Sequence, residues 1–151
     1  MPNRKASLAT ATVLMTLSYL CSAQSGKVES VGPLTESAVS EQVRQNLEGK
    51  GYRLTLDDSK PFCELWLRKS VPAQSGKSTE LAYPQFAESE LLGAIHFPQA
   101  VADFRGQPIP AGFYTMRYEL LPDDGNHLGV APNRDFVLLI PAQSDPNPNA
   151  T

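Results

Sequence analysis

The sequence predicts a mainly β protein, specifically an antiparallel β-sandwich or partly open barrel with one short N-terminal α-helix. Three observations support this class. Apolar residues alternate with a period of two in several short segments, Pro- and Gly-rich turns separate those segments, and one segment alone has helical periodicity. A chain of 151 residues can bury one hydrophobic core, so we expect a single domain, which we place at residues 35–142.

Residues 1–23 have the pattern of a signal peptide. Arg4 and Lys5 precede an uncharged apolar run at residues 6–20, and small residues follow up to Ala23. We expect cleavage near Ala23 and an extracytoplasmic location, periplasmic or secreted. A retained anchor is the alternative, but hydroxyl side chains dilute the apolar run, so no stable membrane span is expected in the mature chain.

The two cysteines point to a protein without an internal disulfide. Cys21 belongs to the leader, and lipid attachment there is disfavoured because the bulky Leu20 precedes it. Cys63 then stands alone in the mature chain. It alternates with Leu65 and Leu67, which predicts a small buried hydrophobe, with a reactive thiol or an intermolecular disulfide as the alternative.

The distribution of charged residues indicates which classes of partner are disfavoured. The chain has a formal net charge of −3, and removal of the leader takes away two basic residues and no acidic one. Lys and Arg are scattered along the sequence instead of clustered. Nucleic acid and anionic membrane surfaces reward clustered basic residues, so neither is expected as the main partner.

The first elements of the mature chain are a flexible leading segment at residues 24–34 and one amphipathic helix at residues 35–49. Apolar residues recur every four positions in the helical segment, capping residues precede them, and a glycine ends the run. The apolar positions are Val39, Val43 and Leu47, the candidate caps are Thr35 and Ser37, and the terminating residue is Gly49.

Strands follow the helix. Segments 52–56 and 62–71 alternate around a polar turn and predict a hairpin, and a Ser-, Gly- and Pro-rich loop follows at residues 71–83. Further strands are expected at 91–97, 113–121 and 136–140, before a Pro- and Asn-rich tail, residues 143–151, for which we expect disorder.

The second half of the chain contains two distinctive motifs, Ile109-Pro110-Ala111-Gly112-Phe113-Tyr114-Thr115 and Asp124-Gly125-Asn126-His127-Leu128-Gly129-Val130-Ala131-Pro132-Asn133-Arg134-Asp135-Phe136. Together they resemble an uncharacterised family of exported bacterial β-sandwich domains. The first is also similar to the turn-into-strand signature of transthyretin-like domains. The resemblance spans about residues 50–142 and implies a β-sandwich fold. It implies no activity and no catalytic residue.

The connection between the last two predicted strands, residues 122–135, is the candidate ligand-binding segment. It is far longer than the about two to five residues of a simple hairpin, and long loops on a rigid scaffold often carry binding residues. A structural loop closed by turns is the competing interpretation. The candidate ligand-binding residues are Asp124, Asn126, His127, Arg134 and Asp135, and a divalent metal held by Asp124, His127 and Asp135 is the alternative.

Two classes of function are open. The first is an exported, non-enzymatic binding or structural module without a cofactor, whose partner is a protein, a glycan or a cell-surface component contacted by the loops together with Trp66 or Tyr83. The second is a small metal-binding protein or metal-dependent enzyme that uses the 122–135 loop. No pairing of a nucleophile with a base is evident, which favours the first class. His96, in an apolar strand, is interpreted as a structural residue.

Overall fold

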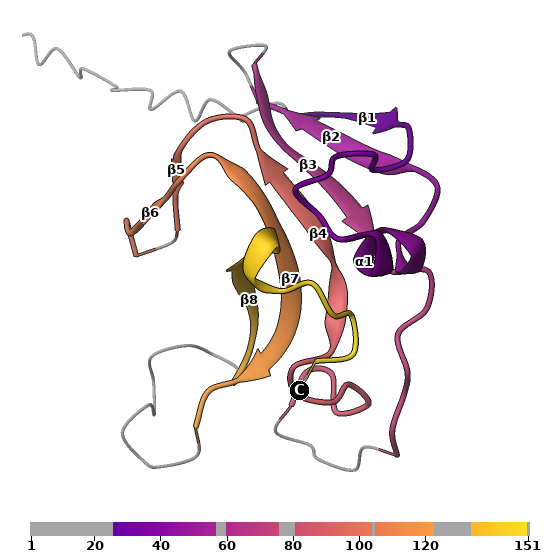
Figure 1. Cartoon of the computed structure of the whole chain (residues 1–151). Helices are drawn as coiled ribbons and strands as arrows, with labels where there is room; N and C mark the ends of the chain where they lie inside the picture. The colour runs from indigo at the N-terminus through magenta and orange to yellow at the C-terminus, as the bar shows by residue number, and fades with distance from the viewer. Residues whose placement is uncertain (1–25, 57–59, 76–80, 104, 123–133, 151) are drawn as a thin grey trace, which may run out of the picture.

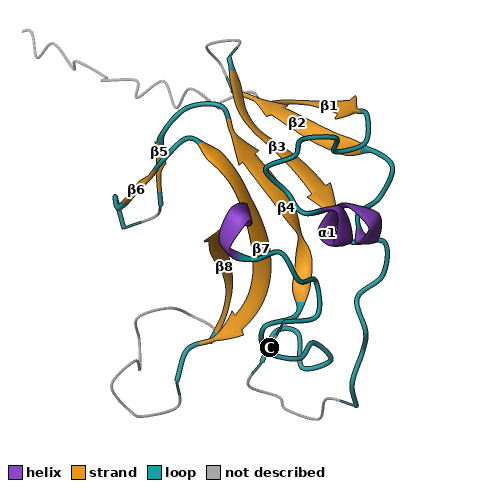
Figure 2. Ribbon diagram, viewed as in Figure 1, coloured by secondary structure: helices purple, strands orange, loops and turns teal. Residues whose placement is uncertain are grey.

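The computed structural model describes residues 26–56, 60–75, 81–103, 105–122 and 134–150. Within these ranges the protein is mainly β, with a six-stranded antiparallel sheet, a two-stranded antiparallel sheet and very little helix (Figures 1 and 2). The predicted mainly β, antiparallel class is therefore confirmed. No helix in these ranges is long and apolar enough to cross a membrane.

The large sheet has the strand order β1-β2-β3-β4-β7-β8, and every neighbouring pair is antiparallel. A short hairpin, β5–β6, forms the small sheet between β4 and β7 along the chain. The elements are β1 (Lys27–Val31), α1 (Glu41–Asn46), β2 (Gly51–Thr55), β3 (Pro61–Leu67), β4 (Leu91–Phe97), β5 (Val101–Ala102), β6 (Pro108–Ile109), β7 (Gly112–Leu120), β8 (Asp135–Pro141) and the 3₁₀ helix η1 (Ala142–Ser144).

The leading segment differs from the flexible one expected at residues 24–34. Lys27–Val31 pairs with β2 along its whole length, and Leu34 is buried in the core. Residues of β1 are mostly exposed, so backbone pairing holds this edge strand and hydrophobic alternation contributes little. Side-chain periodicity cannot reveal such a strand, because its residues do not alternate between buried and exposed positions.

The helix is shorter than the predicted segment at residues 35–49. Ser40, and not Thr35 or Ser37, is the N-cap: its hydroxyl accepts a hydrogen bond from the Val43 amide at 3.2 Å. The predicted apolar stripe of Val39, Val43 and Leu47 is nevertheless buried. Periodicity therefore identified the inward face correctly, although the flanking residues adopt a turn and an extended bridge instead of helix.

The core between α1 and the sheet includes the single tryptophan. Trp66 is 5% exposed, and its indole Nε1 donates to the Gly32 carbonyl at 2.9 Å. Its expected role as a surface contact is therefore wrong, because the ring fills the core and ties the chain after β1 to β3. The buried residues of this core are Leu34, Val39, Val43, Leu47, Trp66, Leu91, Ala94 and Ala142.

A second apolar cluster contains Cys63, Phe97 and Tyr114, and the β5–β6 residues Val101 and Ile109 pack against it. The Cys63 thiol is free and buried, which confirms the prediction of a small buried hydrophobe. Burial also raises the pKa of this thiol, so the reactive thiolate is disfavoured.

Candidate functional site

The structure describes two of the five predicted ligand-binding residues, Arg134 and Asp135. Arg134 Nε donates to the Leu121 carbonyl at 2.9 Å, and the Leu121 amide donates to the Arg134 carbonyl at 2.8 Å. These bonds join the two ends of the long connection. Asp124, Asn126 and His127 lie outside the described residues, so the divalent-metal alternative stays a prediction.

Asp135, at the start of β8, joins three parts of the chain. Its Oδ1 accepts from the Tyr118 hydroxyl at 2.6 Å and from the Tyr83 amide at 3.0 Å, and its Oδ2 accepts from the Ala82 amide at 3.0 Å. The carboxylate therefore fastens the loop before β4 to β7 and β8. Sequence placed Asp135 at a candidate site, but its partners come from distant segments.

Hydrogen bonding also sets the charge states at this point. Burial opposes ionisation of Asp135, but the hydrogen bonds from Tyr118 and the two loop amides outweigh it, and the pKa of Asp135 lies below its ordinary value of 3.8. Burial and then the adjacent Asp135 raise the pKa of the Tyr118 phenol well above its usual value. At neutral pH the pair is a carboxylate that accepts a hydrogen bond from a neutral phenol.

A groove of about 480 Å³ adjoins Asp135. Aromatic rings form part of its wall: Tyr83 stacks on Phe86 with ring centres 5.6 Å apart, and Phe86 meets Tyr118 edge to face, also at 5.6 Å. Strand residues from β3, β4 and β8 complete the wall. The lining residues are Leu67, Arg68, Val71, Tyr83, Phe86, Leu92, Tyr118, Asp135, Phe136 and Val137.

Exposed apolar side chains gather at this groove. Across the described ranges, the large hydrophobic side chains left exposed are Val28, Leu67, Tyr83, Phe136, Val137 and Leu138, and four of these line the groove. Tyr83 is 52% exposed and Val137 51%. Exposed apolar surface that is concentrated in one concave place, and not scattered singly, is typical of a binding site.

The basic residue of the groove has an acidic partner beside it. Arg68 forms an ion pair with Glu90, and the arginine side chain is 7% exposed. The pair neutralises the guanidinium within the protein. Asp135 thus brings a carboxylate to a wall that is otherwise largely apolar.

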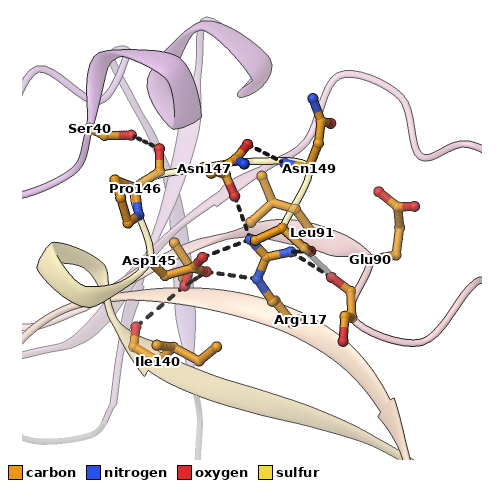
Figure 3. Close-up of polar contacts among 12 residues, drawn as sticks. Ser40, Glu90, Leu91, Arg117, Ile140, Asp145, Pro146, Asn147 and Asn149 are labelled. Carbon is orange, nitrogen blue, oxygen red and sulfur yellow. Dashed lines mark hydrogen bonds and ion pairs between the residues drawn. The ribbon is translucent and has the colours of Figure 1, made fainter.

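A second polar cluster lies under the C-terminal segment and is centred on Arg117 of β7 (Figure 3). Arg117 Nε and Nη2 donate to the two Asp145 carboxylate oxygens at 2.7 and 2.8 Å. The remaining three N–H groups donate to the carbonyls of Ser89, Asn147 and Ala150 at 2.5, 2.7 and 2.9 Å. All five guanidinium donors are therefore used.

This cluster explains a difference from the disordered tail expected at residues 143–151. Asp145 is 6% exposed and also accepts a hydrogen bond from Thr115 Oγ1 at 2.6 Å. Ser40, the cap of α1, donates to the Pro146 carbonyl at 2.6 Å. The described part of the tail is therefore fixed across the sheet by non-local polar contacts, and its Pro- and Asn-rich composition gave no sign of them.

The burial of the Arg117 cluster indicates a structural role. Burial opposes ionisation of Asp145, but hydrogen bonds from Arg117 and Thr115 outweigh it, so the pKa of Asp145 lies below its ordinary value. Both side chains of the ion pair are almost completely buried, at 3% and 7% exposed. A ligand could reach them only by displacing the tail.

His96 is also satisfied within the fold. Its Nδ1 lies 3.2 Å from Glu64 Oε2, and its ring stacks on Phe113 at 4.1 Å between centres. Arg53 pairs with the same Glu64 carboxylate at 2.6 Å. These contacts agree with the structural interpretation of His96, and its position relative to His127 lies outside the described residues. In the described part of the chain, no group of three or more His, Cys, Asp or Glu side chains is placed to hold a metal ion.

Comparison with known proteins identifies no relative: no protein-family model, curated protein or solved structure matches the chain. The function must therefore be inferred from the groove itself. Sequence reasoning named Tyr83 and Asp135 but missed Leu67, Phe86 and Tyr118, because these come from separate elements that only the folded sheet brings together.

Proposed function

We propose that the protein is an exported, non-enzymatic binding module that accepts an apolar or aromatic group in the groove beside Asp135. The observation that carries this proposal is the concentration of exposed apolar side chains in one concavity. Its volume of about 480 Å³ is in the size range of small-molecule sites.

The groove favours a ligand with an apolar body and one hydrogen-bond donor. Asp135 lines the groove and accepts hydrogen bonds from the Ala82 and Tyr83 amides and from the Tyr118 hydroxyl. The lowered pKa keeps Asp135 ionised at neutral pH. A hydroxyl or amine on the ligand would be attracted to this carboxylate, and the rings of Tyr83, Phe86 and Tyr118 would cover the apolar body.

The residue types in the groove support binding in preference to catalysis. Its described lining contains no Ser, Thr, Cys, His or Lys side chain. The Tyr118 phenol is already bonded to Asp135, and its raised pKa makes it a poor acid at neutral pH. The wall therefore offers shape and apolar surface, without a nucleophile next to a base.

The proposal includes location and architecture. The charged start, apolar run and small residues of the leader support export, so the partner would be met outside the cytoplasm, as a protein, a glycan or a cell-surface component. We also propose a reduced β-sandwich, related to the exported bacterial domains that the sequence resembles. Packing of Val101 and Ile109 from the β5–β6 hairpin against Phe97 and Tyr114 of the large sheet supports a second layer.

Binding of N-phenyl-1-naphthylamine, an aromatic amine that fluoresces in apolar surroundings, tests the proposal. We expect saturable fluorescence enhancement with the wild type. Tyr83→Ala should weaken binding about three- to tenfold, because it removes one aromatic wall of the groove. Tyr83 is about half exposed, so the melting temperature should change little.

Val28→Ala is the matched control, since Val28 is an exposed apolar residue on β1, at the opposite edge of the sheet. Its affinity for the dye should equal that of the wild type. No saturable binding by the wild type, or equal affinity in Tyr83→Ala, would show that the groove is not a binding site.

A further inference from the structure

The last strand of the large sheet leaves an apolar edge. Among the described strands, β7 alone pairs with β8, so the outer edge of β8 has no partner there (Figure 1). Five successive apolar residues, 136–140, occupy this strand. Phe136, Val137 and Leu138 are 38%, 51% and 39% exposed.

The opposite edge of the sheet has a different character. In β1, Lys27 and Glu29 form an ion pair at 2.8 Å, and both side chains are well exposed. Charged residues on an edge strand discourage pairing with other chains, and free apolar edges are templates for it. Among the described residues, charged side chains thus protect the β1 edge, whereas the outer edge of β8 is apolar and unpaired.

We propose that β8 is a self-association surface, on which β8 of a second copy pairs antiparallel and continues the sheet across a two-fold axis. An antiparallel strand pair is self-complementary, because each strand presents the same edge to the other. Such a contact closes on itself and yields a dimer.

The register follows from the length of β8. A two-fold axis at Leu138 pairs all residues of Asp135–Pro141 with none left over. Residues that face each other across an antiparallel pair lie on the same face of the sheet. Phe136 therefore meets Ile140 of the second copy, Val137 meets Leu139, and Leu138 meets its own counterpart.

The distribution of charge favours pairing of β8 with β8 of a second copy over pairing of β8 with β1. Residues 136–144 carry no charge, so two β8 edges bring apolar groups together without repulsion. Asp135 would face Pro141, and its carboxylate is already bonded within its own chain. Pairing of β8 with β1 would instead place Lys27 and Glu29 among apolar side chains, at a cost in desolvation.

The surface area that two paired β8 strands can bury limits the affinity of the dimer. One strand edge buries much less than the roughly 1,600 Å² of a standard stable interface. The dimer is therefore expected to be weak and to form as the protein concentration rises. Val137 lines the groove, so Leu139 of the second copy would extend its apolar wall, but pairing does not depend on a bound ligand.

Sedimentation equilibrium over a concentration series tests the dimer. The wild-type mass should rise from monomer to dimer. Leu138→Lys and Leu138→Glu should each remain monomeric, with association weakened about tenfold or more, because like charges would meet on the axis. An equimolar mixture of the two variants should associate again, because Lys then faces Glu.

Val28→Lys is the matched control at the other edge, and its self-association should equal that of the wild type. Thermal melts of each variant check that the monomer is folded. Leu138 does not line the groove, so dye binding by these variants separates this proposal from the previous one. A wild type that stays monomeric, or no association in the mixture, would overturn the proposed pairing, as would growth beyond a dimer.

Discussion

Arg117 is the side chain on which most of the tail contacts depend. A buried guanidinium is costly unless every donor is matched, and here Asp145 and three carbonyls match all five. The ion pair therefore contributes specificity: it fixes one position of the tail over β7. Loss of either partner would leave a buried charge without compensation.

Asp145→Asn tests this dependence. The substitution keeps the shape of the side chain but removes its charge, and breaking a buried ion pair typically costs about 3 to 5 kcal/mol. Urea denaturation should show a loss of that size in the free energy of unfolding. Glu41→Gln, in the exposed pair with Arg44, should cost less than about 1 kcal/mol, and an equal loss in both variants would contradict the special role of Asp145.

The same carboxylate predicts a pH dependence. The pKa of Asp145 is lower in the folded protein than its ordinary value of 3.8, so the unfolded chain binds its proton first as the pH falls. The stability contributed by Asp145 is present above that ordinary value and is lost as the pH falls through the folded pKa. The stability difference between the wild type and Asp145→Asn should therefore shrink below about pH 4. A difference that is constant down to acid pH would argue against the ion pair.

At the scale of elements, the pairing of β4 with β3 requires a glycine at position 93, opposite Leu67. A Cβ at Gly93 would overlap the backbone carbonyl oxygen of Trp66 and crowd the Met116 methyl group at 3.0 Å. The register of β4 against β7 also shifts between Leu91 and Gly93. Both neighbouring strands are central, so the chain has little freedom to move away.

Gly93→Ala should consequently lower the free energy of unfolding by about 1 to 3 kcal/mol, as overpacking in a core does. Gly49→Ala is the control, because a Cβ there meets nothing within 4 Å. The control should be neutral or slightly stabilising, since alanine restricts the unfolded chain. Thermal melts of the two variants measure the contrast, and similar melting temperatures would show that the strands can separate to admit a methyl group.

The elements that sequence predicted are those held by side-chain alternation. The hairpin of β2 and β3 and the strands β4, β7 and β8 occur close to the predicted segments. The strand β1 and the tail were missed because backbone pairing and the Arg117 cluster hold them, and neither leaves a local pattern. The groove was only partly predicted for the same reason. Asp135 lies at the end of the candidate ligand-binding segment, residues 122–135, whereas Tyr118 and Leu67 line the groove from other strands.

At the scale of the whole molecule, the predicted leader would determine in which compartment the groove and the β8 edge act. Mass spectrometry of the protein recovered from its native host should find a mature chain that begins at or near Gln24, because signal peptidase cleaves after small residues such as Ala23. A mature chain that keeps Met1 would refute removal of the leader, and one that begins with a lipid-bearing Cys21 would refute cleavage after Ala23.

The docking of the tail also has a consequence for synthesis. A ribosome makes Arg117 well before its last acceptor, which lies 33 residues further along the chain. A nascent chain that stops before Asp145 contains the strands of the sheet but no carboxylate to pair with the Arg117 guanidinium. Burial of that unpaired charge against β7 is then unfavourable. Folding of this face would thereby depend on translation of residues 145–150, and chains terminated before them would expose a face that chaperones and proteases can recognise.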